Sequence, residues 1–193
     1  MSVVVIEPPE PIVSLTQAKR QLRVELEDST DDEMIEGLIA AATATIDGPS
    51  GWLGRALGRQ TLELRGPCFL PGVELPYQPV ISVESVIHVD AAGTEQTIAP
   101  EGYFLEAGRF VRPVSGWIGS LAWRSDEVRI RYVAGWPMSD GNSPVWTGPA
   151  PIRQAVLMMV TRLYANRGED RPTNAVEDPA INALLSPWRV WSL

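Results

Sequence analysis

The sequence predicts an α+β protein in which a helical-bundle core, made of an αα-hairpin and a long C-terminal helix, carries an inserted small antiparallel β unit. Three observations lead to this prediction. Apolar residues recur at helical spacing near both ends, polar and apolar residues alternate through the middle third, and Gly, Pro, Asp and Asn clusters separate the alternating runs. We expect an N-terminal arm and helical hairpin over residues 1–57, a β-rich subdomain over 58–147, and a C-terminal helix with a short tail over 148–193, with the helical parts forming one core.

The first helical part contains two helices joined by an acidic turn. Ser14 and Gln17 have the spacing of a capping box, in which each side chain bonds the other residue's backbone N–H, so we expect a helix over 15–26. Acidic residues then precede an alanine-rich apolar stripe, which predicts a second helix over 31–47. Ahead of both, the proline-rich arm over 1–13 favours an extended path that either pairs with a neighbour or stays loose.

The middle of the chain has the period of half-buried strands. Runs of alternating or β-branched residues predict strands over 60–65, 80–89, 95–98, 103–105, 109–111 and 127–133. The last of these has the cleanest alternation in the chain. Short loops between the runs indicate an antiparallel arrangement.

After the β unit, early prolines open a helix expected over 151–167, and one or two helical turns are expected over 179–185. The chain closes on a tail that contains Trp188, Arg189 and Trp191. Trp and Arg dominate the hot spots of protein interfaces. Two interpretations stay open: the tail folds back onto its own helices, or it docks into a neighbouring subunit or partner.

Reactive residues are scarce. The chain has one cysteine, Cys68, one histidine, His88, and one lysine, Lys19. We expect Cys68 to be a packed or half-exposed thiol, His88 to lie on the polar side of its strand, and Lys19 on the polar side of its helix. No Walker-type loop, nucleophile elbow or metal-ligand spacing occurs. The sequence therefore predicts no enzyme, no catalytic or metal-binding residue and no cofactor, although paired-carboxylate chemistry is not excluded by sequence.

Bulk charge limits the possible partners. The net charge is −8 and the pI about 4.7, whereas a free nucleic-acid binder normally presents a basic face to phosphates. An acidic surface that faces DNA without binding it stays open as an interpretation, because carboxylates and phosphates repel each other. No signal peptide is visible and no apolar run approaches the roughly 20 residues of a membrane span, so we expect a soluble protein with no membrane partner.

The order and spacing of six segments carry a family resemblance. They are residues 14–24, 31–42, 132–137, 151–160, 163–167 and the closing Leu-Leu-Ser-Pro-Trp-Arg-Val-Trp over 184–191. Together these segments resemble the longer branch of the head–tail connector (adaptor, or head-completion) proteins of long-tailed phages and phage-derived gene transfer agents. The resemblance covers nearly the whole chain.

The resemblance implies a structural virion protein. Family members have a helical core and form a ring, usually of twelve copies, beneath the portal protein. The ring extends the DNA channel, lets double-stranded DNA pass without sequence-specific binding, and offers a platform to a stopper, neck or tail-terminator protein. Such a protein is made in the bacterial cytoplasm and incorporated in the neck of the virion or particle. The alternative is another neck or tail-completion structural protein of a phage-like particle.

Two sets of residues become candidate sites under this resemblance. C-terminal segments of the family commonly engage the portal, which implies a portal-docking tail made of Leu184, Leu185, Pro187, Trp188, Arg189, Val190 and Trp191. The helices over 15–26, 31–47 and 151–167 would form the ring core. The net charge further suggests channel-lining candidates, namely Glu25, Glu27, Asp28, Asp31, Asp32, Glu33 and Glu36.

Overall fold

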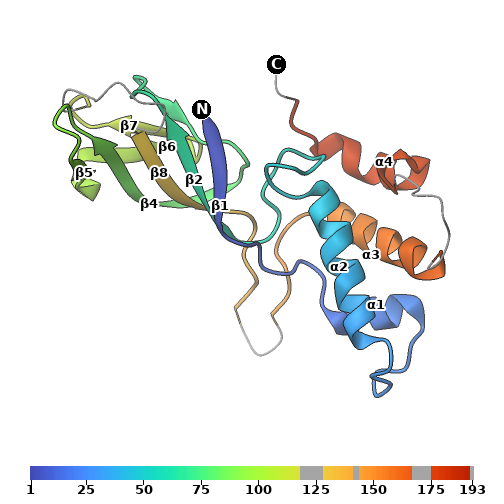
Figure 1. Ribbon diagram of the computed structural model, residues 1–193. Coiled ribbons are helices and arrows are strands. Elements are labelled where there is room, and N and C mark those ends of the chain that lie inside the picture. Colours follow the sequence, from blue (N-terminus) through green and yellow to red (C-terminus); the bar gives the residue numbers. More distant parts are fainter. Residues whose placement is uncertain (118–127, 141–143, 167–174, 192–193) are drawn as a thin grey trace. The chain divides into compact units, whose positions relative to one another are not determined.

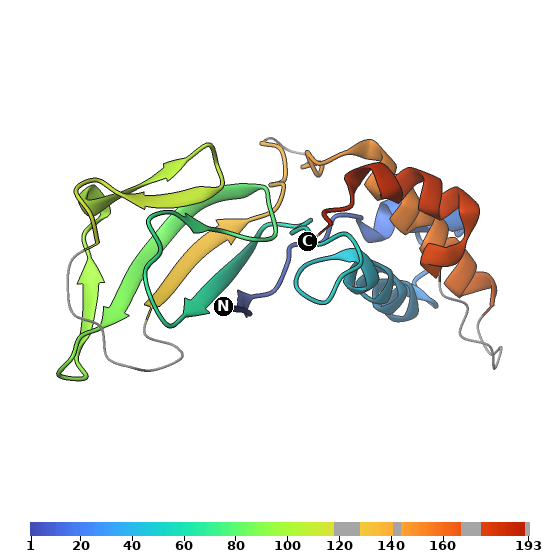
Figure 2. The same cartoon turned by 90° about the horizontal axis from the view of Figure 1, so that it is seen from above.

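The computed structural model describes residues 1–117, 128–140, 144–166 and 175–191. The chain forms two compact units, one of Met1–Glu10 with Ala56–Trp136, and one of Pro11–Arg55 with Pro137–Leu193. Strands gather in the first unit and helices in the second (Figures 1 and 2). The predicted α+β fold class is confirmed, and the strand pairs are antiparallel.

The larger sheet of the β unit has five strands. Their order is β1 (Ser2–Glu7), β2 (Gln60–Gly66), β8 (Val128–Ala134), β4 (Val80–Val89) and β5 (Glu95–Ile98). The alternation predicted along β8 is real, since Ile130 and Tyr132 are fully buried whereas Arg129 and Arg131 are only half-buried. The sheet therefore has one apolar face and one face that carries charged side chains.

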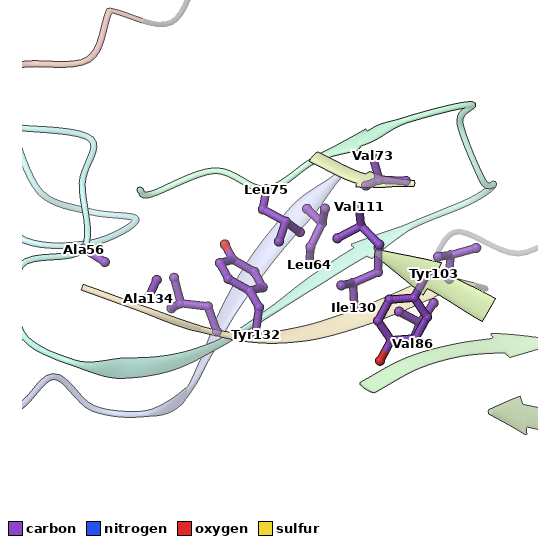
Figure 3. Close-up of a cluster of buried hydrophobic side chains, with 12 residues drawn as sticks. Ala56, Leu64, Val73, Leu75, Val86, Tyr103, Val111, Ile130, Tyr132 and Ala134 are labelled. Atoms are coloured by element: carbon purple, nitrogen blue, oxygen red, sulfur yellow. The ribbon is translucent and has the colours of Figure 1, made fainter. Parts of the chain in front are cut away.

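A second, three-stranded sheet pairs β3 (Val73–Glu74), β7 (Phe110–Pro113) and β6 (Tyr103–Glu106) in that order. Side chains from both sheets meet in one buried cluster (Figure 3). Tyr132 lies in this cluster, and its hydroxyl donates to the carbonyl oxygen of Pro76 at 2.9 Å. Burial raises the pKa of Tyr132, as expected for a phenol removed from water.

The helical unit contains α1 (Leu15–Leu22), α2 (Asp32–Ile46), α3 (Ala150–Ala165) and α4 (Pro179–Leu185). α2 packs against α3, α1 contacts both, and α4 packs on α3. The buried side chains of these helices are mainly aliphatic: Ala18, Ile35, Ile39, Ala42, Ile46, Ile152, Ala155, Val156, Met159, Val160, Ile181 and Leu185.

Most element positions agree with the sequence predictions, and the differences have local causes. The capping box is present, with both reciprocal hydrogen bonds between Ser14 and Gln17. The helix expected over 15–26 ends at Leu22, because Arg23 takes a left-handed conformation with φ 59° and ψ 35°. Strands β1 and β3 were not predicted; β1 occupies the arm that was expected to be extended and either paired or loose, and it pairs with β2.

The placement predicted for Lys19 is wrong. Its side chain is 3% exposed, its Nζ donates to the carbonyl oxygen of Leu26 at 3.1 Å, and it forms an ion pair with Asp32 at 2.6 Å. A lysine can be buried when its ammonium group finds such partners while its aliphatic stem packs among apolar atoms. Lys19 therefore links α1, the following turn and the start of α2.

The placement predicted for His88 is also wrong. It lies opposite Val128 in the β4–β8 pairing, shares a sheet face with the buried Val86, and is 7% exposed. Its ring meets Phe69 edge-on with 5.8 Å between centroids. The run around His88 has apolar residues on both faces, so sequence alternation could not decide which face is buried.

Candidate docking surface and acidic turn

The start of the C-terminal segment is fixed by a capped and anchored helix. The Asp178 side chain accepts hydrogen bonds from the backbone N–H groups of Ala180 and Ile181, at 2.8 and 3.4 Å, and so caps α4. Asp178 also pairs with Arg162 of α3 at 2.7 Å. Ile181 and Leu185 are buried, so α4 holds the beginning of the tail in place on the helical unit.

Beyond α4 the tail runs along the segment that follows α2. A 3-10 turn over Ser186–Trp188 leads into it. The Val190 N–H then donates to the Leu53 carbonyl oxygen at 2.9 Å, and Arg55 Nε donates to the Trp188 carbonyl oxygen at 2.6 Å. Burial lowers the pKa of the Arg55 guanidinium, which nevertheless stays charged. These contacts join residues more than 130 positions apart in the chain.

The receiving segment is itself well held. Leu53 is fully buried, and the N–H groups of Trp52 and Leu53 donate to the carbonyl oxygens of Thr45 and Ile46, at 3.0 and 3.3 Å. Gly54 has φ +64°, and a Cβ there would lie 3.3 Å from the Val190 carbonyl oxygen. A glycine at this position suits both the left-handed backbone and the close approach of the tail.

Two tryptophans enclose the arginine of the tail. The Arg189 guanidinium carbon lies 4.2 Å from the centre of the Trp52 ring and 4.1 Å from that of Trp191. Both distances are within the range of a cation–π contact. We call the residues that join the tail to the segment after α2, or flank those contacts, the tail clasp; it consists of Trp52, Arg55, Trp188, Arg189, Val190 and Trp191, of which Trp188 and Val190 take part through their backbone.

The predicted docking residues fall into three classes of exposure. Leu185 is core, whereas Leu184, Trp188 and Arg189 are half-buried. Pro187 is exposed, and Val190 and Trp191 are 44% and 70% exposed. Sequence reasoning missed Trp52 and Arg55, because only the fold brings the segment after α2 to the tail.

The seven acidic candidates lie around the turn between α1 and α2. Glu25, Glu27, Asp28, Glu33 and Glu36 are exposed. Asp32 pairs with Lys19, and Asp31 accepts a hydrogen bond from the Tyr164 hydroxyl at 2.5 Å. Hydrogen bonds from the side chain and backbone of Thr30 lower the pKa of Asp28. The structure thus divides the set into five solvated carboxylates and two that hold the turn to the helices.

The few reactive residues do not gather into a site. Cys68 is exposed and His88 is buried. Among the described residues, no group of three or more His, Cys, Asp or Glu side chains is placed to hold a metal ion. Within those same residues, no helix is long and apolar enough to cross a membrane.

Comparisons with known proteins show the same fold in three solved structures. A chain from the neck of an empty gene transfer agent (GTA) particle, computed with C6 symmetry, matches with a TM-score of 0.77 and 20% identity. A chain from the virion of a native GTA particle matches with 0.73 and 21%, and one from the neck of a native GTA particle, computed with C12 symmetry, with 0.68 and 20%. Each match covers 100% of this chain and 97% of the other. No protein-family model and no curated protein sequence matches. The whole chain, β unit and helical unit together, therefore has the fold of chains found in GTA necks and virions.

Proposed function

We propose that this protein is a structural subunit of the neck of a phage-like particle, and more specifically a ring-forming head–tail connector beneath the portal. The observation that carries the proposal is the agreement in fold over the full length of chains from GTA necks. A match restricted to the helical unit or to the β unit would support only a shared module. The order of segments in the sequence supports the same role.

A ring of about twelve copies fits this role. The necks to which the similar chains belong were computed with C6 and C12 symmetry. Cyclic rings close through heterologous contacts, in which one patch of a subunit meets a different patch of the next. In such a ring, we expect the helical unit to supply the contacts between copies.

The proposed role requires no catalysis. In the part of the chain that the structure describes, the only histidine is buried beside Phe69 and no cluster of metal ligands forms. The work expected of this protein is to bind neighbours and to extend a channel.

Portal attachment through the tail is tested by deleting residues 187–193, of which 192 and 193 lie outside the described residues. The α4 cap and the core residues Ile181 and Leu185 remain, so the truncated chain should fold. It should lose about 1–3 kcal/mol of unfolding free energy, because the two tail hydrogen bonds and the arginine–tryptophan contacts are removed. Electron microscopy should show capsids without attached connectors. Particles with normal necks would defeat the docking proposal.

The exposed acids are proposed to line the DNA channel, where like charge keeps DNA from sticking. The triple variant Glu25→Gln, Glu27→Gln, Glu33→Gln should form rings but slow DNA passage, measured as the rate of DNA release from particles. A matched control is Glu10→Gln, Glu84→Gln, Glu101→Gln, which removes the same charge from exposed positions of the β unit. A particle map that places the acidic turn far from the channel axis would rule the proposal out.

The alternative is another neck or tail-completion protein, because the similar chains are described only as parts of a neck or a virion. The two roles differ in what the protein stays bound to. A connector should remain on heads that lack tails, whereas a tail-completion protein should copurify with tails that lack heads.

A further inference from the structure

We propose that the surface that binds the partner is the closed tail clasp itself, including Trp52, and that it recognises a carboxylate set beside apolar surface. This inference rests on the proposed function, in which the tail docks to the portal. It adds Trp52 to the docking residues, assigns the partner a carboxylate beside apolar surface, and states that binding takes place with the clasp closed.

The first argument is that the tail is already positioned. Capping by Asp178 and burial of Leu185 fix its start, and the bonds Val190–Leu53 and Arg55–Trp188 fix its path. A segment that is ordered before binding loses less conformational entropy when it docks. Opening the clasp would discard these contacts and add that ordering cost.

The second argument is that closing the clasp does not hide the tail. Val190 stays 44% exposed and Trp191 stays 70% exposed with the clasp closed. An autoinhibitory contact would cover these apolar side chains, whereas here they stay exposed while the Trp191 ring also contacts Arg189. The closed form thus presents an aromatic and aliphatic surface of the kind that dominates binding hot spots.

The third argument concerns Arg189. Its guanidinium contacts both Trp52 and Trp191 through the rings, and among the described residues it has no carboxylate partner. Stacking on rings uses the faces of the guanidinium plane and leaves its in-plane N–H groups free to bond a carboxylate in bidentate fashion. Arg55, the other arginine of the clasp, already donates through Nε to the Trp188 carbonyl oxygen. Arg189 is therefore the cation that an acidic side chain of the partner would meet.

Closed-clasp binding and tail release make opposite predictions for Trp52. If the closed clasp binds, removing Trp52 takes away part of the surface and loosens Arg189, so affinity falls. If the tail must peel away and bind alone, removing Trp52 frees the tail, so affinity stays the same or rises. A synthetic peptide of residues 184–193 should likewise fail to compete in the first case and compete in the second.

The experiment measures binding of the purified full-length chain to purified portal rings. Trp52→Ala and Arg189→Lys should each weaken binding by roughly ten-fold or more, with Trp52→Phe retaining most of it. Arg189→Lys keeps the charge but lacks the planar fork, so its loss tests bidentate recognition. Phe104→Ala, at an exposed aromatic of the β unit, is the matched control and should bind normally. If Trp52→Ala does not fold, the peptide competition decides between the closed clasp and a released tail, and Arg189→Lys still tests recognition of the carboxylate.

The outcomes separate this inference from the proposed function. Unchanged or tighter binding by Trp52→Ala, or competition by the peptide, would overturn the closed clasp while leaving tail docking in place. Normal binding by the chain lacking residues 187–193 would overturn tail docking itself. A loss of affinity in Arg189→Lys together with normal thermal unfolding would support recognition of a carboxylate by Arg189, because a merely structural role would lower stability instead.

Discussion

Glu63 shows how a single buried charge is satisfied inside a sheet. Its side chain is 4% exposed, and it accepts hydrogen bonds from Arg65 at 2.8 Å and from Arg131 at 3.0 Å. Burial alone would raise the pKa of Glu63, but the hydrogen bonds and charges of the two arginines outweigh it and lower the pKa. Because Arg131 lies opposite Glu63 in the β2–β8 pairing, this network supports that register.

The lowered pKa of Glu63 predicts acid sensitivity. A carboxylate favoured in the folded state contributes stability above its unfolded pKa, near 4.5, and this contribution is lost as the pH falls through the lower folded value. Glu63→Gln should therefore reduce the unfolding free energy by about 1–3 kcal/mol at neutral pH. Between about pH 7 and pH 3, the unfolding free energy of the variant should fall less than that of the unsubstituted chain. Urea unfolding at both pH values measures this, with the exposed Glu101→Gln as control. Equal pH dependence in Glu63→Gln and the control would contradict the prediction.

At the scale of elements, the α1–α2 connection is held at both ends. Arg23 reverses the chain through a left-handed backbone, with the Val24 N–H donating to the Lys19 carbonyl oxygen at 3.0 Å. The buried Lys19 ammonium then donates to the Leu26 carbonyl oxygen and pairs with the Asp32 carboxylate. The carboxylates of this turn repel one another. The buried Lys19 and the left-handed backbone of Arg23 hold the turn in place against that repulsion.

The left-handed residue offers a test of this account. Arg23→Gly should stabilise the chain by about 1 kcal/mol, because glycine takes positive φ without the steric cost of a Cβ. Arg20→Gly removes the same charge from an exposed position inside α1 and should destabilise by about 1 kcal/mol. Thermal unfolding of both variants gives the comparison. Similar losses in both would mean that the turn does not depend on the Arg23 backbone.

At the scale of the whole molecule, two units built on different periodicities share one chain. The β unit takes its first strand, Ser2–Glu7, from the N-terminus and the rest from the middle of the chain. That strand lies at a sheet edge with Val4, Val5 and Ile6 all more than a third exposed. The helical unit combines segments from both sides of the β unit, so neither unit is a continuous stretch of sequence.

If the protein is a connector, its oligomeric state should differ between the isolated chain and the particle. The isolated chain should be monomeric or weakly associating in light scattering, since a connector's full set of contacts would form only in the neck. Purified particles should contain about twelve copies per portal ring, measured by quantitative mass spectrometry against the portal protein. A stable closed dimer in solution, or one or two copies per particle, would contradict this role.

Local patterns determined the identity and position of most elements. The Ser14–Gln17 capping box, the alternation along β8 and the stripe of α2 each depend on residues close in sequence, and each occurs as predicted. The composition of the tail predicts an interface at Trp188, Arg189 and Trp191, and docking of these residues to a partner stays a prediction. Short-range periodicity and caps act within a few residues, so one sequence suffices to find them.

Contacts between distant segments were decided only by the tertiary structure. The burial of Lys19 depends on Asp32 and the Leu26 carbonyl, and that of His88 on the pairing of β4 with β8. The pairing of Trp52 and Arg55 with the tail depends on how α4 packs on α3. In each of these contacts, the residues that flank one group in the sequence do not indicate which group it will meet in the fold. Which face is buried, and which side chains meet, therefore follows from packing rather than from local pattern.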